Sequence, residues 1–131
     1  MHFTITTRPH HTAEPVVITV TGELDLTAEP ELTASTATAL AATRASADGP
    51  PAALIADLTA TTFCSAGCLE ILHTAHRQAA GHGSALLLVT GQPALLRPIA
   101  LLGMTFDLAP TLGHALTRLQ PPPRPARTSE R

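Results

Sequence analysis

The sequence has 131 residues, enough for one domain with a single hydrophobic core. Apolar residues make up 44% of it, but aromatic residues only 2%, and Trp and Tyr are absent; this argues against an aromatic platform for sugars or single-stranded nucleic acid. The formal net charge is −2 and Lys and Arg together number 8, so electrostatic binding of nucleic acid is not expected.

Neither end of the chain has the pattern of a targeting or membrane segment. The N-terminus lacks the apolar run of a signal peptide, and no stretch approaches the ~20 apolar residues that cross a bilayer. Residues 120–131 are rich in Pro and Arg and offer little to a core, which predicts a disordered tail after a domain that spans 1–119. We therefore expect a cytoplasmic protein with no membrane contact.

The first third of the chain predicts a hairpin and a helix. Phe3–Thr7 alternates apolar and polar residues, and Val16–Thr21 is almost entirely β-branched and ends at Gly22, so the two segments predict paired strands. A helix is expected to start near Thr27–Pro30 and to run to about Ala45. Its inward face is defined by two leucines, Leu32 and Leu40.

The middle of the chain predicts the central strand and the second helix. Ala53–Leu58 has no polar alternation before Asp57, as in a strand covered on both faces. Thr59–Thr62 is expected to turn the chain, and a helix should follow from Ser65 to about Ala80, stopped by glycines.

The last third continues the alternation of strand and helix. We expect a buried strand over Ala85–Thr90, a helix over Gln92–Leu102 that contains Pro98, a short strand over Phe106–Leu108, and a helix over Leu112–Leu119 with Thr111 as its N-cap. The order β-β-α-β-α-β-α-β-α predicts a single α/β domain with a mixed sheet of about five strands and about four helices.

The junction between the central strand and the second helix is the strongest candidate site. Ser65 stands at the helix start among small residues, so that a partner could approach the backbone closely. Two roles fit this hydroxyl: it can cap the helix, or it can carry a phosphate. Thr61 and Thr62 are nearby hydroxyls that fit a turn better.

Cysteine and histidine pairs are further candidates for chemistry. Cys64 and Cys68 are four apart, which on one helix would place them about 6 Å from each other. A small buried residue and a reactive thiol both fit, because a helix start can lower a thiol pKa. His73 and His76 lack a third ligand at helical spacing, so no metal and no cofactor is expected.

Several segments together resemble one known family. They are GELDLTAEPEL (22–32), LIADL (54–58), FCSAG (63–67), HRQAAGHG (76–83) and PALLRPIALLGM (93–104). In combination they resemble the STAS domain of bacterial anti-sigma factor antagonists over about Val16 to Leu119. The resemblance implies the same succession of strands and helices.

The resemblance also implies a function without enzymatic activity. Such antagonists bind an anti-sigma factor with serine kinase activity, free the sigma factor, and are released when a Ser at the helix start is phosphorylated; a cognate phosphatase would reverse the step. Carried over by motif, the phosphorylated residue is Ser65. The implied partner-binding residues are Asp25, Cys64, Ser65, Ala66 and Gly67.

Some of these residues depart from the family pattern or have a second interpretation. Cys64 stands where the family has Asp, which removes a carboxylate beside the acceptor, and Ala66 replaces a second small hydroxyl residue. Asp25 could contact a partner or cap the following helix. The missing side chain of Gly67 could leave the surface flat for a partner or allow the helix to pack closely against the sheet.

Two other functions therefore stay open. One is a STAS scaffold of a sensory complex that is not phosphorylated, and the other is a thiol-dependent redox protein that uses Cys64. The first strand, if it is an exposed edge, would also allow a homodimer by edge pairing.

Overall fold

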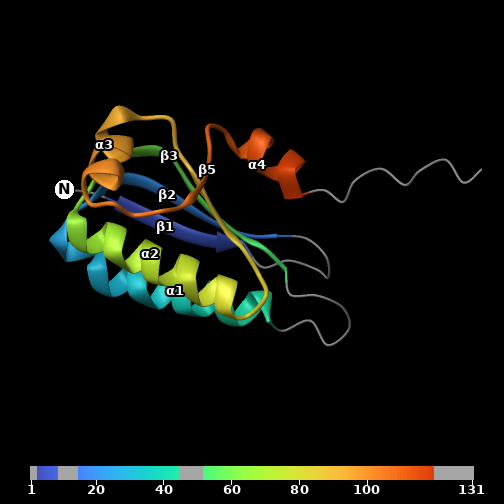
Figure 1. Ribbon diagram of the computed structural model, residues 1–131. Coiled ribbons are helices and arrows are strands. Elements are labelled where there is room, and N and C mark those ends of the chain that lie inside the picture. Colours follow the sequence, from blue (N-terminus) through green and yellow to red (C-terminus); the bar gives the residue numbers. More distant parts are fainter. Residues whose placement is uncertain (1–2, 9–14, 45–51, 120–131) are drawn as a thin grey trace, which may run out of the picture.

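The computed structural model describes residues 3–8, 15–44 and 52–119 (Figure 1). The expected tail at 120–131 lies outside the described residues. So do most of the connection between the first two strands and the loop expected around Ala47–Pro51.

Within the described residues, five strands form one mixed sheet in the order β1-β2-β3-β4-β5. Their bounds are β1 Phe3–Arg8, β2 Val16–Leu24, β3 Leu54–Cys64, β4 Leu86–Val89 and β5 Asp107–Ala109. The β1–β2 pair is antiparallel and the other three pairs are parallel. The expected hairpin and the central place of the third strand are confirmed. β1 is an edge strand, and edge pairing to a homodimer stays a prediction.

The helices cover both faces of this sheet. Their bounds are α1 Glu29–Thr43, α2 Ala66–Gly81, α3 Pro93–Leu101 and α4 Leu112–Leu119, with a short 3-10 turn, η1 Leu26–Ala28, ahead of α1. Figure 1 shows α1 and α2 side by side on one face and α4 on the other. The order of elements and the single α/β domain agree with the sequence-based prediction.

The two faces of β3 belong to different parts of the core. Leu54, Ala56 and Leu58 join the larger cluster with the buried leucines of α1 and α2, whereas Ile55 joins a smaller one with Leu87 beneath α4. This explains why both faces of the strand carry apolar residues: alternate side chains enter opposite layers, and both layers are buried. Leu32 and Leu40 are buried as expected.

The predicted turn at Thr59–Thr62 is wrong. These residues continue β3, with Ala60 opposite Thr21 and Thr61 opposite Gly22. The buried Thr61 hydroxyl donates a hydrogen bond to Val20 O at 3.0 Å, and its β-branched side chain suits a strand. Residues that favour turns by composition are thus held in the sheet by pairing.

The predicted end of the second strand at Gly22 is also wrong. β2 continues to Leu24, and its register against β3 shifts between Gly22 and Glu23. Gly22 has a φ of 95°, which a residue without a side chain adopts at little cost. Beyond this irregular step the strand continues to Leu24, which pairs with Cys64, so the GELD segment ends beside the end of β3.

The predicted start of the first helix is confirmed. The residues after Asp25 form η1, and α1 begins at Glu29, within the predicted Thr27–Pro30, and ends at Thr43. Ala45, the expected end, lies outside the described residues. Within the described ranges no helix is long and apolar enough to cross a membrane.

Candidate functional site

The ends of two parallel strands bring the GELD and CSAG segments together. Leu24, the last residue of β2, pairs with Cys64, the last residue of β3. One residue further, Ser65 N donates a hydrogen bond to Leu24 O at 2.8 Å. Residues some forty positions apart in sequence therefore share one end of the sheet, where α1 and α2 also begin (Figure 1).

Ser65 is the N-cap of α2. It has an extended backbone conformation, and its Oγ accepts a hydrogen bond from Cys68 N at 3.1 Å. Ser65 is half-buried and Ala66 is exposed, so the residue that caps the helix stays partly accessible. Capping uses only one lone pair of the oxygen, and it does not by itself exclude modification.

Asp25 caps the 3-10 turn, not α1 itself. Its Oδ1 accepts hydrogen bonds from Thr27 N at 3.0 Å and from Thr27 Oγ1 at 2.5 Å. The Thr27 side-chain hydrogen bond is the main cause that holds the pKa of Asp25 below its ordinary value. A fixed negative charge therefore stands at the end of β2.

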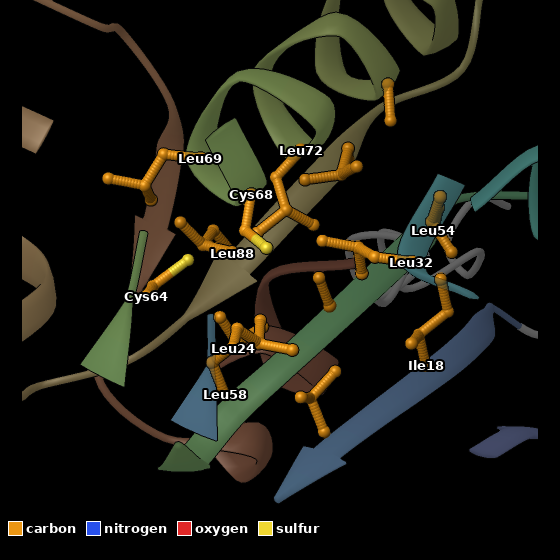
Figure 2. Close-up of a cluster of buried hydrophobic side chains, with 14 of the residues drawn as sticks. Ile18, Leu24, Leu32, Leu54, Leu58, Cys64, Cys68, Leu69, Leu72 and Leu88 are labelled. Atoms are coloured by element: carbon orange, nitrogen blue, oxygen red, sulfur yellow. The ribbon is translucent and has the colours of Figure 1, made fainter. Parts of the chain in front are cut away.

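The two cysteines are core residues. Cys64 is 3% exposed and Cys68 is fully buried, and Figure 2 shows both sulfur atoms among the side chains of Leu24, Leu69, Leu72 and Leu88. Cys64 is the last residue of β3, so the two do not share a helix as the sequence spacing suggested.

The electrostatics of these thiols oppose nucleophilic chemistry. Burial, and then the neighbouring Cys68, raises the pKa of Cys64 to about 12. Burial also raises the pKa of Cys68, whose Sγ donates to Asp25 O at 3.5 Å. The thiolate is the reactive form, so the redox hypothesis for Cys64 loses its physical basis. The buried Cys64 side chain also lies below the surface on which it was expected to meet a partner.

Three neighbouring residues were not predicted as part of the site. Leu26 and Phe63 are 74% and 45% exposed. In sequence, Leu26 directly follows Asp25, and Phe63 lies two residues before Ser65. The Glu29 carboxylate lies against Gly67, because a Cβ built on that glycine would come within 2.8 Å of Glu29 Cδ. The sequence did contain a signal for Leu26 and Phe63. Each is an apolar residue within a polar motif, at a position that no apolar face of a helix or strand explains.

The histidine pair belongs to a packing cluster. The rings of His73 and His76 lie 5.3 and 5.7 Å from that of Phe106, measured between centroids. Among the described residues, no three His, Cys, Asp or Glu side chains form a group that could hold a metal ion.

Comparison with known proteins identifies the family. The family described as "Mlab, STAS domain" matches residues 7–110, most of the chain. The protein therefore belongs to the STAS domain family, whose succession of strands and helices it shares. None of the curated proteins compared with the chain matches it.

Solved structures narrow the likeness to one kind of STAS protein. An anti-sigma factor antagonist from Mycobacterium paratuberculosis is 31% identical, with a TM-score of 0.75 over 90% of this chain and 94% of that one. SpoIIAA in its unphosphorylated form is 18% identical, with a TM-score of 0.66 over 88% and 97%. The Bacillus cell fate determinant SpoIIAA in its phosphorylated form is 22% identical, with a TM-score of 0.62 over 89% and 100%. The last two likenesses are likenesses of fold.

Proposed function

We propose that the protein is an anti-sigma factor antagonist that binds an anti-sigma factor with serine kinase activity and is released when Ser65 is phosphorylated. A cognate phosphatase would return it to the binding form. The observation that carries the proposal is the position of Ser65: a half-buried hydroxyl residue at the start of α2, where the two motif segments meet. The 31% identity to an anti-sigma factor antagonist supports it.

The surface around Ser65 suits a protein partner. Leu26 and Phe63 offer exposed apolar side chains, and Asp25 offers a charge whose position is fixed by Thr27. Protein interfaces commonly combine apolar anchors with a charged rim. We infer that Asp25, Ser65, Ala66 and Gly67 form the contact surface together with these two side chains.

Phosphorylation would act on the interface more than on the fold. The γ-phosphoryl group passes from a nucleoside triphosphate to Ser65 Oγ, the nucleoside diphosphate leaves, and the hydroxyl proton passes to a base. Because Cys64 stands where the family has Asp, that base would come from the kinase. A phosphate adds about −1.5 to −2 charges, which the start of a helix tolerates but an interface fitted to a neutral hydroxyl does not.

The direct experiment is phosphosite mapping with a binding assay. Purified protein is incubated with ATP and each anti-sigma factor kinase of its host, the modified residue is identified by mass spectrometry, and affinity is measured by calorimetry before and after. We expect phosphate on Ser65, loss of affinity with it, and retained affinity for Ser65→Ala. Phosphate elsewhere, or equal affinity with and without phosphate on Ser65, would refute the switch.

Two observations favour a second function. The Ser65 hydroxyl already serves as a cap, and the carboxylate that precedes the family's acceptor is replaced by the buried Cys64. A STAS scaffold that binds its partner constantly fits these two facts. The same experiment separates the two: stable binding with Ser65 unmodified under all conditions would support the scaffold.

A further inference from the structure

The carboxylate of Glu29 occupies the first turn of α2, although it belongs to another helix. Glu29 is the first residue of α1, and one of its carboxylate oxygens would be even closer than Cδ to a Cβ built on Gly67. A side chain on residue 67 would have to displace this carboxylate. The contact places a negative charge two residues beyond the Ser65 hydroxyl.

This charge has an electrostatic reason to be there. The first turn of α2 contains no acidic residue of its own, although a helix start favours negative charge. Ser65 Oγ accepts from Cys68 N, but the N–H groups of Ala66 and Gly67 precede the reach of intrahelical hydrogen bonds. Glu29 supplies from α1 the charge that α2 lacks.

The field of Glu29 is felt within the site. After burial, the charges of Glu29 and Asp25 are the causes that further raise the pKa of the Cys68 thiol. Cys68 is the residue whose N–H the Ser65 hydroxyl caps. A charge on Ser65 would therefore be placed in the same region as the Glu29 carboxylate.

We propose that Glu29 holds the place of a phosphate in the unmodified protein, so that a phosphate on Ser65 and the Glu29 carboxylate compete for the first turn of α2. Phosphorylation then drives the Glu29 side chain off Gly67 and changes the surface at the start of α1 as well as that of α2. This inference rests on the proposed phosphorylation of Ser65, and it adds a positioning residue from a second helix to the switch.

A double-mutant cycle tests the competition without any partner. Ser65→Asp and Ser65→Asn are both good N-caps and differ in charge, so their difference in Tm measures the cost of the charge. With Glu29 present we expect Ser65→Asp to melt roughly 2–5 °C below Ser65→Asn. In the Glu29→Gln background most of this gap should close.

The matched control is Glu31→Gln. Glu31 lies in the same first turn of α1 and is exposed, whereas the carboxylate against Gly67 is that of Glu29. The Glu31 variant should leave the gap between Ser65→Asp and Ser65→Asn unchanged. A gap that stays equal in the Glu29→Gln background, or the same closure by Glu31→Gln, would overturn the inference.

A spectroscopic measurement excludes a purely structural role. In protein with phosphoserine installed at position 65 by semisynthesis, ³¹P NMR follows the second ionisation of the phosphate. A like charge raises such a pKa, so Glu29→Gln should lower it by a few tenths of a pH unit, and Glu31→Gln should not. An unchanged value in Glu29→Gln would contradict the competition.

These tests fail separately from the proposed function. Both use isolated protein and need no kinase. If position 65 and Glu29 are coupled but no host kinase phosphorylates the protein, the proposed function is refuted and the electrostatic competition is supported. Phosphorylation of Ser65 without coupling would do the reverse.

Discussion

Two helices of this domain begin in the same way, yet only one start has the features of a binding site. Ser65 Oγ accepts a hydrogen bond from Cys68 N at 3.1 Å, and Thr111 Oγ1 accepts one from His114 N at 3.0 Å. Each hydroxyl residue follows a parallel strand by a short step, and each caps the N–H three residues on. By local geometry α2 and α4 are equivalent.

The difference lies in what stands beside each start. α2 begins where the ends of β2 and β3 meet, whereas α4 follows β5, an edge strand of three residues. A Cβ on Gly67 would meet Glu29, but the glycine at the same position in α4, Gly113, has nothing within 4 Å of its Cβ position. A capping hydroxyl therefore marks a helix start, and the neighbouring segment turns it into a site.

The largest expected effect is that of a charge at each cap. Ser65→Asp should weaken binding to the anti-sigma factor by at least about thirtyfold, or ~2 kcal/mol, because the charge enters the interface. Thr111→Asp should change affinity less than about twofold, since Asp also caps a helix. Calorimetry with the purified partner measures both. Equal losses for the two variants would mean that the interface does not centre on α2.

The next largest effect is expected from the exposed apolar side chains near the start of α2, compared with one on α4. Leu26→Ala and Phe63→Ala should each cost about 1–3 kcal/mol of binding free energy, with little change in Tm because both side chains are exposed. Leu116→Ala, on exposed α4, is the control and should leave affinity unchanged. If Leu116 mattered and Leu26 and Phe63 did not, the binding surface would lie at the other helix.

The buried thiols beneath the α2 start predict a loss of stability in alkali. The folded pKa of Cys64 is raised from 9.0 to about 12, so the unfolded chain releases its proton first. The stabilisation is complete below pH 9 and falls by about 1.4 kcal/mol per pH unit between 9 and 12. Urea unfolding at pH 8 and pH 10 should show the loss in wild type and a smaller one in Cys64→Ala. A parallel loss in both proteins would contradict the burial of this thiol.

The sequence sufficed for the elements that are defined locally. The apolar run of β3, the cap at Ser65 and the helical spacing of Leu69 and Leu72 each lie within one short window, and so they predict the fold and the helix start at Ser65. Residues Thr59–Thr62 misled, because their composition favours a turn while pairing with β2 keeps them in the sheet.

The rest of the site depends on contacts between distant segments. Glu29 meets Gly67 only because β2 runs past Gly22 and delivers the start of α1 to the start of α2. Nothing in either short window shows that register. The exposure of Leu26 is likewise set by η1, a turn that amphipathic periodicity does not reveal.

Loss of either cap should cost the same stability. Ser65→Ala and Thr111→Ala each remove one side-chain acceptor from an N-terminal N–H, which typically costs about 1 kcal/mol of the free energy of unfolding. Urea titration of both variants measures it. Affinity for the partner should survive in both, because neither adds charge. A far larger cost for Ser65→Ala would show that its hydroxyl supports more of the fold than one cap bond.

The smallest effect compares the second helical position of each helix. Gly113→Ala should stabilise the protein by roughly 0.5–1 kcal/mol, because Ala is the better helix former and its Cβ meets nothing. Gly67→Ala should gain less, since its Cβ must push the Glu29 carboxylate away from the start of α2. In a Glu29→Ala background this obstacle is gone, and Gly67→Ala should match Gly113→Ala. Urea unfolding of the four variants measures these changes in the free energy of unfolding. If Gly67→Ala has the same effect with Glu29 and with Ala at position 29, the carboxylate does not affect this turn.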